Sequence, residues 1–200
     1  MLAVLALLLI SISAPVRAHH VGAYVPRDNE ISANFKQIKF SAQAQKFAVA
    51  LKLYEDGALR RELRKQSPTL PPGLDASIRG ALTAGDGPAV EAGLMVFFAA
   101  LVRGLALEAD RQLADARTPP AVRVAGGSKF LDAIWRYYNL VDFAVSQRDP
   151  KAATAVRLAF EEAEGHAKAR APEQMRTSLT RIARILAGVI EASSLTRRHS

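Results

Sequence analysis

Hydrophobic residues in this chain recur mainly at the three- and four-residue spacing of a helix, and the alternation typical of strands is almost absent. Proline and glycine fall in clusters between the apolar runs, which is the punctuation of an all-helical protein. The first apolar run, from Ile31 to Tyr54, predicts a helix that ends at Gly57. A break near Gln45 and Lys46 would instead make this segment a helical hairpin, and the sequence leaves both arrangements open.

Two short helices and one long helix are predicted next. Residues 58–66 form a basic helix, and residues 74–84 form a second short helix that Gly85 ends. A long helix then covers residues 88–114. Between residues 92 and 102 this helix is uncharged and apolar on every face, so we predict that it is the most buried helix of the fold. That apolar stretch is shorter than the roughly 20 residues that a membrane span needs.

The C-terminal half of the chain carries further start and stop signals. Gly126 and Gly127 predict a break, after which Ser128 caps a helix that is rich in aromatic residues. Asp149 is followed by proline, and this pair is a strong signal for the start of a helix. Pro172 opens the last predicted helix.

These elements predict an all-α fold, a single antiparallel bundle of about five long helices with one or two short helices, built from helical hairpins. The bundle domain covers residues 29–193. An extended arm over residues 19–28 precedes it, and a basic tail over residues 194–200 follows it. A chain of this length buries a core large enough for one domain.

The first 18 residues indicate export. An apolar run over residues 2–12 is followed by Val16 and Ala18, which fit the small-residue pattern of a signal-peptidase site. Cleavage after Ala18 predicts a periplasmic or secreted protein without a transmembrane span in the mature chain. Two alternatives to cleavage stay open. The segment is either retained as a membrane anchor or is an N-terminal helix of the folded protein.

Composition narrows the classes of function. The chain has no cysteine, which excludes disulfides, cysteine nucleophiles, zinc–thiolate sites and iron–sulfur clusters. Its net charge of +8 favours an acidic periplasmic protein or an anionic membrane surface as partner. Nucleic acid is not expected for an exported protein whose aromatic residues are few and clustered. The densest basic cluster is the predicted interaction patch, Arg60, Arg61, Arg64 and Lys65.

Two sets of residues are candidates for binding a metal. Cleavage after Ala18 would make His19 the first residue, with His20 beside it, and a terminal amine and imidazole together chelate copper(II). Within the helical part, Glu162 and His166 are four residues apart and share a helix face, which suits iron. No second helix carries the same motif, and both sets are otherwise ordinary polar surface residues.

An aromatic segment supplies the last candidate, a small anion or metal pocket formed by Arg136, Tyr137, Tyr138 and Asp142. Tyr138 and Asp142 share a face, so we expect Asp142 to accept a hydrogen bond from the Tyr138 hydroxyl or to pair with Arg136 or Arg148. Tyr137 points to another side of the helix. The alternative is that these rings only fill the core, as aromatic stripes on helices usually do.

No recognisable catalytic arrangement is present, since the sequence has no nucleophile elbow, no phosphate-binding glycine loop and no convincing pair of carboxylates. We therefore expect a protein that is not an enzyme and needs no cofactor. The predicted function is that of an exported, non-catalytic interaction or accessory protein with a basic surface. The alternative is a metal-binding accessory protein that holds copper or iron through the histidines and glutamate named above.

Overall fold

The computed structural model describes residues 28–196, which form eight α-helices and one 3-10 turn and contain no strand. In chain order these are α1 (Glu30–Gln43), α2 (Phe47–Asp56), α3 (Ala58–Lys65), η1 (Ser67–Thr69), α4 (Leu74–Ala84), α5 (Gly87–Leu113), α6 (Pro120–Arg148), α7 (Pro150–Lys168) and α8 (Pro172–Thr196). The predicted all-α class is confirmed. The predicted helix lengths differ, because four of the described helices have 19 to 29 residues and four have 8 to 14.

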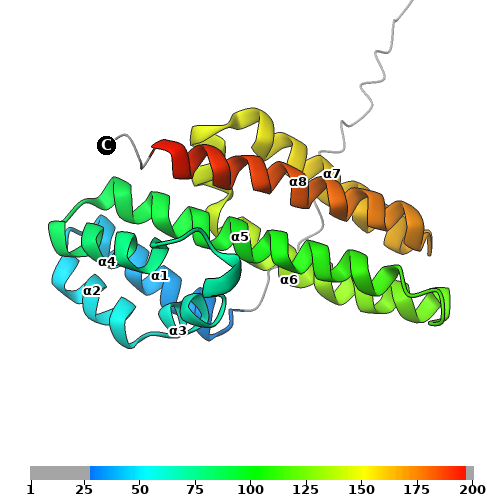
Figure 1. The fold of residues 1–200 in the computed structure, drawn as a ribbon, viewed down its shortest axis with the longest axis horizontal. Coiled ribbons are helices and arrows are strands. Elements are labelled where there is room, and N and C mark those ends of the chain that lie inside the picture. Colours follow the sequence, from blue (N-terminus) through cyan, green and yellow to red (C-terminus); the bar gives the residue numbers. More distant parts are fainter. Residues whose placement is uncertain (1–27, 197–200) are drawn as a thin grey trace, which may run out of the picture.

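The four long helices lie side by side as two connected pairs, α5 with α6 and α7 with α8 (Figure 1). The helix α5 packs along both α6 and α8, and it is the centre of the core. Its residues from Leu94 to Ala99 are all at most 2% exposed, so this stretch is enclosed on every side, as its uniformly apolar sequence predicts. Among the described helices, α5 is long and apolar enough to cross a membrane. Because most of its apolar stretch is buried inside the protein, this is weak evidence for a span.

The four short helices lie beside the N-terminal half of α5, where α4 and α1 contact it and α2 and α3 pack on α1 and α4 (Figure 1). The segment that the sequence left open is two helices, because α1 ends at Gln43 and the backbone turns at Gln45 with a left-handed φ of 57°. The Lys46 amide donates to the Ser41 carbonyl at 2.8 Å and the Gln45 amide donates to the Ala42 carbonyl at 2.9 Å. This is the Schellman pattern that closes a helix, here with glutamine in place of the usual glycine.

Asn34 of α1 holds the junction between α2 and α3. Its side-chain amide donates to the Leu53 carbonyl at 3.0 Å, and its side-chain oxygen accepts from the Leu59 amide at 3.0 Å. The last carbonyls of α2 and the first amides of α3 have no partner within their own helices, so one side chain caps both ends. Gly57 sits between the two helices, and a Cβ there would lie 2.1 Å from the Asn34 side-chain oxygen.

The predicted break at Gly126 and Gly127 is wrong, because α6 is continuous from Pro120 to Arg148. Gly127 allows a close approach of neighbouring helices instead. A Cβ on this residue would lie 2.8 Å from Cε of Met175 in α8 and 3.1 Å from Cδ2 of Leu113 in α5. Ser128 is not a cap, since its hydroxyl donates to the Val124 carbonyl inside the helix at 3.0 Å.

Other helix boundaries agree with the sequence. The Asp86 carboxylate accepts from the Ala89 amide and caps α5, and the Asp149 carboxylate accepts from the Ala152 amide and caps α7. Both helices continue with proline in their first turn, as expected. The helix α8 begins at Pro172.

Candidate functional site

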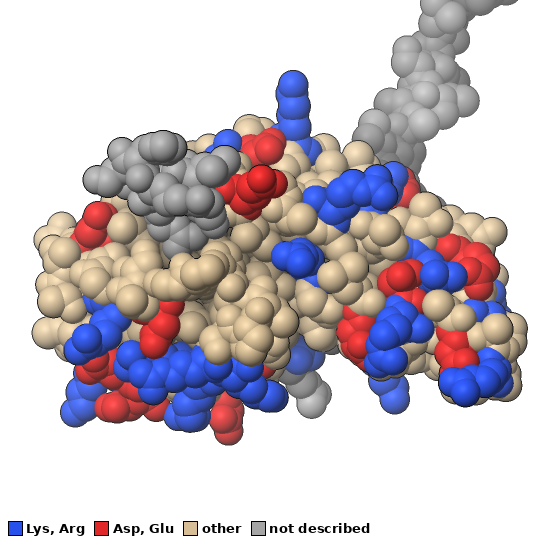
Figure 2. Space-filling model, in the orientation of Figure 1, with Lys and Arg blue, Asp and Glu red and all other residues tan. Residues whose placement is uncertain are grey.

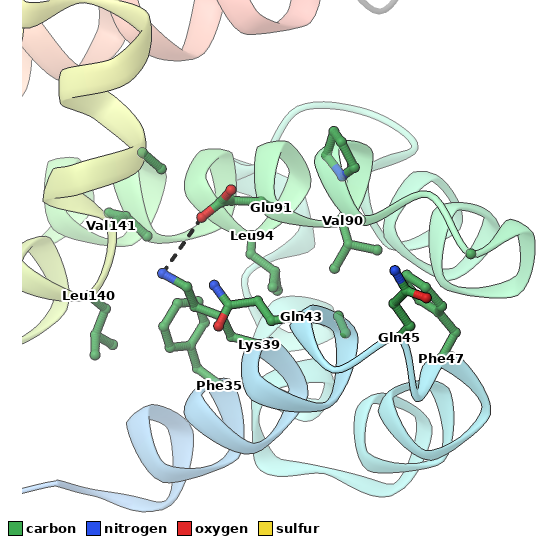
Figure 3. A pocket seen from close by; sticks show the side chains of 15 residues that line it. Phe35, Lys39, Gln43, Gln45, Phe47, Val90, Glu91, Leu94, Leu140 and Val141 are labelled. Atoms are coloured by element: carbon green, nitrogen blue, oxygen red, sulfur yellow. Dashed lines mark ion pairs between the residues drawn. The ribbon is translucent and has the colours of Figure 1, made fainter.

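A recess with an apolar floor lies where α1 separates from α5, beside α6 (Figure 3). This α1/α5/α6 groove has a volume of about 600 Å³. At one end it reaches α6, and at the other it reaches the start of α2 and the turn between α4 and α5. Its lining residues are Phe35, Lys39, Ala42, Gln43, Gln45, Phe47, Gly85, Gly87, Pro88, Val90, Glu91, Leu94, Leu140, Val141 and Ala144.

The floor of the groove is formed by buried apolar side chains. Phe35, Val90, Leu94 and Val141 are each at most 4% exposed, and they belong to α1, α5 and α6. Half-buried apolar side chains form the rim, including Leu140 and Ala144 of α6 and Phe47 of α2. Three helices thus contribute to one continuous apolar surface, which is the composition typical of ligand sites.

One ion pair joins the two long walls of the groove. Nζ of Lys39 on α1 lies 3.6 Å from a carboxylate oxygen of Glu91 on α5 (Figure 3). The side chains are 25% and 47% exposed, so the pair lies on the solvent side of the buried floor. Nζ of Lys39 also lies 5.9 Å from the centre of the Phe35 ring, where its charge is attracted to the ring face.

The two most exposed large hydrophobic side chains of the described residues flank this groove. Phe40 of α1 is 64% exposed and Phe143 of α6 is 66% exposed. Phe40 lies three residues before Gln43, and Phe143 lies three residues after Leu140, so each phenylalanine neighbours a lining residue on its own helix. Each wall of the groove thus carries one exposed phenylalanine outside the lining.

The predicted interaction patch is built around an internal acid, Asp75 of α4. Nε of Arg60 lies 2.8 Å from one Asp75 oxygen, and Nε of Arg64 lies 3.4 Å from the other. The buried Tyr54 hydroxyl donates to Asp75 at 2.7 Å. Burial alone would raise the pKa of the Asp75 carboxyl, but the hydrogen bonds from Arg60 and Tyr54 hold that pKa below its usual value. Burial and the bond to Asp75 raise the pKa of Tyr54. This cluster ties α2, α3 and α4 together.

The other two patch residues also have acidic neighbours. Arg61 lies 3.9 Å from Glu30, and Lys65 lies 3.8 Å from Glu62, although both basic side chains are largely exposed. Figure 2 shows Lys and Arg over the α2–α3 end of the molecule with Asp and Glu among them. Residues 28–196 contain all 19 acidic residues and 23 of the 27 basic ones, so half of the net charge of +8 belongs to arginines outside them.

The predicted aromatic pocket is not one pocket, because its residues face different neighbours. The Tyr137 hydroxyl accepts from the Asn29 side-chain amide at 2.7 Å, and the Tyr137 ring packs against Phe98 of α5. Tyr138 instead points toward α7, with its hydroxyl 3.5 Å from the Ala153 carbonyl. Both rings are buried, which agrees with the alternative that they fill the core.

Asp142 has the predicted hydrogen-bond partner, the Tyr138 hydroxyl, but its ion-pair partner differs from those predicted. Nε of Arg157 on α7 lies 3.0 Å from its carboxylate, so Asp142 pairs with neither Arg136 nor Arg148. It does lie close to Tyr138, since burial first and then the negative charge of Asp142 raise the pKa of the Tyr138 hydroxyl. The helical spacing around Asp142 could not predict Arg157 as its partner, because Arg157 lies on the next helix.

The helical metal candidate has no third ligand. Within residues 28–196, no three His, Cys, Asp or Glu side chains come together in a way that could hold a metal ion. Glu162 forms an ion pair with Arg181 of α8, and its carboxylate lies 3.5 Å from the Ser178 hydroxyl. His19 and His20 lie outside the described residues, as do the predicted signal peptide, nearly all of the arm and most of the tail.

Sequence reasoning missed the groove. Most of its floor residues look like ordinary core positions of three separate helices, and nothing in the chain shows that α1 and α5 separate here. The one usable signal was Phe40 and Phe143, which fall outside the buried stripes of their helices.

Comparison with protein-family models, with curated proteins and with solved structures finds no match for this chain. The assignment of function therefore depends on the geometry described above.

Proposed function

We propose that this protein is an exported, non-catalytic binding protein and that the α1/α5/α6 groove is its recognition site. The observation that supports this function is a recess of about 600 Å³ with a buried apolar floor and an ion pair at its mouth. Ligand sites commonly have volumes of roughly 300–1,000 Å³ and combine apolar walls with a few polar groups.

The basic patch supports an interaction function less well than the groove does. Docking an acidic protein or an anionic membrane surface requires basic side chains whose charge is available to the partner. Arg60 is only 13% exposed, and both Arg60 and Arg64 already pair with Asp75. Charge reversal at Arg60 would remove one of the two arginines that pair with Asp75 and would place a second acid beside that carboxylate and the buried Tyr54. It would thus test stability before it tested binding.

The proposed function is tested with an uncharged dye that fluoresces in apolar surroundings, N-phenylnaphthylamine. The wild-type protein is expected to bind the dye. Ala144→Trp fills the rim of the groove and should weaken binding by about tenfold or more, since it removes the volume that the dye occupies. Ala125→Trp, on an exposed position of the same helix, is the matched control and should leave dye binding unchanged.

A thermal unfolding curve for each variant separates loss of the site from loss of the fold. If Ala144→Trp unfolds early, Leu140→Gln gives a second test, because it makes the half-buried rim polar without adding volume. The proposal fails if the wild-type protein does not take up the dye. It also fails if both folded groove variants bind the dye as the wild-type protein does.

A further inference from the structure

We infer that the α1/α5/α6 groove binds a free, single-chain fatty acid, with its carboxylate beside Lys39 and its acyl chain along the apolar floor. This inference rests on the proposed binding function and names its ligand class. It follows from three features of the groove: the charge at its mouth, the composition of its floor and the ion pair that joins its walls.

The mouth of the groove favours an anionic group. The Lys39 ammonium lies 3.6 Å from Glu91, which is longer than the 2.7–2.9 Å of a charge-assisted hydrogen bond, so it has donors left for another acceptor. The side chain of Gln43 adds an amide donor beside Lys39 (Figure 3). Glu91 is the one acid in the lining.

The floor suits an acyl chain. The residues that α6 contributes to the lining, Leu140, Val141 and Ala144, are all apolar, as are Phe35 and Leu94 opposite them (Figure 3). Along α5 the lining runs from Gly87 to Leu94, and seven residues of helical rise give a length of about 10 Å. The Lys39–Glu91 pair stands over this apolar floor, beside Leu140 and Val141 (Figure 3). A head group at Lys39 and a hydrocarbon chain on the floor below it would therefore lie within reach of each other.

The ion pair across the groove argues for a slender ligand. Lys39 and Glu91 connect the walls above a buried floor, so an occupant either passes beneath the pair or breaks it. An α-helix of a partner protein is about 10–12 Å wide with its side chains and would have to break the pair. A single acyl chain fits beneath it, and its carboxylate then competes with Glu91 for Lys39.

The experiment displaces the bound dye with three molecules that share one chain length, namely dodecanoate, dodecanol and dodecyltrimethylammonium, each kept below its aggregation concentration. Dodecanoate is expected to bind about five- to tenfold more tightly than dodecanol, as one additional charged hydrogen bond in a half-exposed site would give. Dodecyltrimethylammonium should bind most weakly. Lys39→Gln should remove the preference for dodecanoate over dodecanol and leave dodecanol binding unchanged.

Lys36→Gln is the matched control. Lys36 also lies on α1 and pairs with an acid, Asp28 at 2.8 Å, but it does not line the groove. The preference for dodecanoate should persist in this variant.

The possible results separate the ligand class from the proposed function. If dodecanoate and dodecanol displace the dye equally, and Lys39→Gln changes neither, the fatty-acid inference is overturned while binding in the groove stands. If phosphatidylglycerol vesicles bind the protein and dodecanoate does not, the inference is overturned in favour of a membrane surface. If the wild-type protein never binds the dye, the proposed function fails as well.

Discussion

The Asn34 side chain offers the sharpest test of how the short helices are held. Asn34→Ala removes two hydrogen bonds of 3.0 Å and leaves the Leu53 carbonyl and the Leu59 amide without partners. Each unsatisfied buried group costs about 1–3 kcal/mol. Alanine returns about 0.5 kcal/mol through its better helix propensity, and water can reach part of the site. We therefore expect the free energy of unfolding to fall by about 2–3 kcal/mol.

Urea denaturation followed by far-ultraviolet circular dichroism measures this change. Asn139→Ala is the control, since Asn139 is exposed on α6, and its effect should stay within about 0.5 kcal/mol. Hydrogen exchange gives a local readout, because the Leu59 amide should exchange faster in Asn34→Ala. The reasoning is refuted if Asn34→Ala costs no more than Asn139→Ala, or if exchange in α3 is unchanged.

Three further predictions follow from single features. Gly127→Ala should lower the unfolding temperature, because the added Cβ would lie 2.8 Å from Met175. Gly126→Ala should raise the unfolding temperature, because a Cβ there meets nothing within 4 Å and alanine has the better helix propensity. Equal shifts of the two variants in calorimetry would contradict this. Hydrogen bonds from Arg60 and Tyr54 hold the pKa of Asp75 in the folded protein below 3.8, the usual value for aspartate. The stabilising effect of the Asp75 carboxylate is therefore complete above that pH and is lost as the pH falls through the folded pKa. Asp75→Asn should accordingly lose less stability on acidification than the wild-type protein, as urea midpoints measured across that range would show. Intact-mass analysis of the exported protein should find His19 at the N-terminus, and a retained leader would refute the cleavage. Copper(II) should then bind more tightly than zinc, and one alanine added before His19 should sharply lower the affinity for copper.

Local signals were enough to predict most helix boundaries. Asp86 and Asp149 cap their helices through their own side chains, so the signal and the structure lie within a few residues of each other. The prediction of a helix break at Gly126 and Gly127 failed for a physical reason. A glycine is found both where a helix breaks and where two helices pack closely, and only the position of Met175 shows that Gly127 serves the second purpose.

Charge clusters were harder to interpret because their partners are distant in the sequence. Arg60 and Arg64 look like a free basic surface on their own short helix. Asp75, which pairs with both, lies on α4 beyond the prolines and the 3-10 turn. The same holds for Asp142, whose partner Arg157 belongs to the next helix. A helix pattern predicts which residues share a face but not which acid the neighbouring helix brings to them.

The groove depends on a turn that the sequence left undecided. Because the backbone is left-handed at Gln45, α1 stops there and Phe47 starts a separate helix across from α5. A second left-handed residue, Gly85, ends α4, and a Cβ on it would lie 3.4 Å from the Phe47 ring. These two turns therefore meet and close one end of the groove. An unbroken helix through residue 45 would carry Phe47 past α5. The hairpin of α1 and α2 thus creates the proposed site, and the left-handed backbone at Gln45 is the local feature on which the hairpin depends.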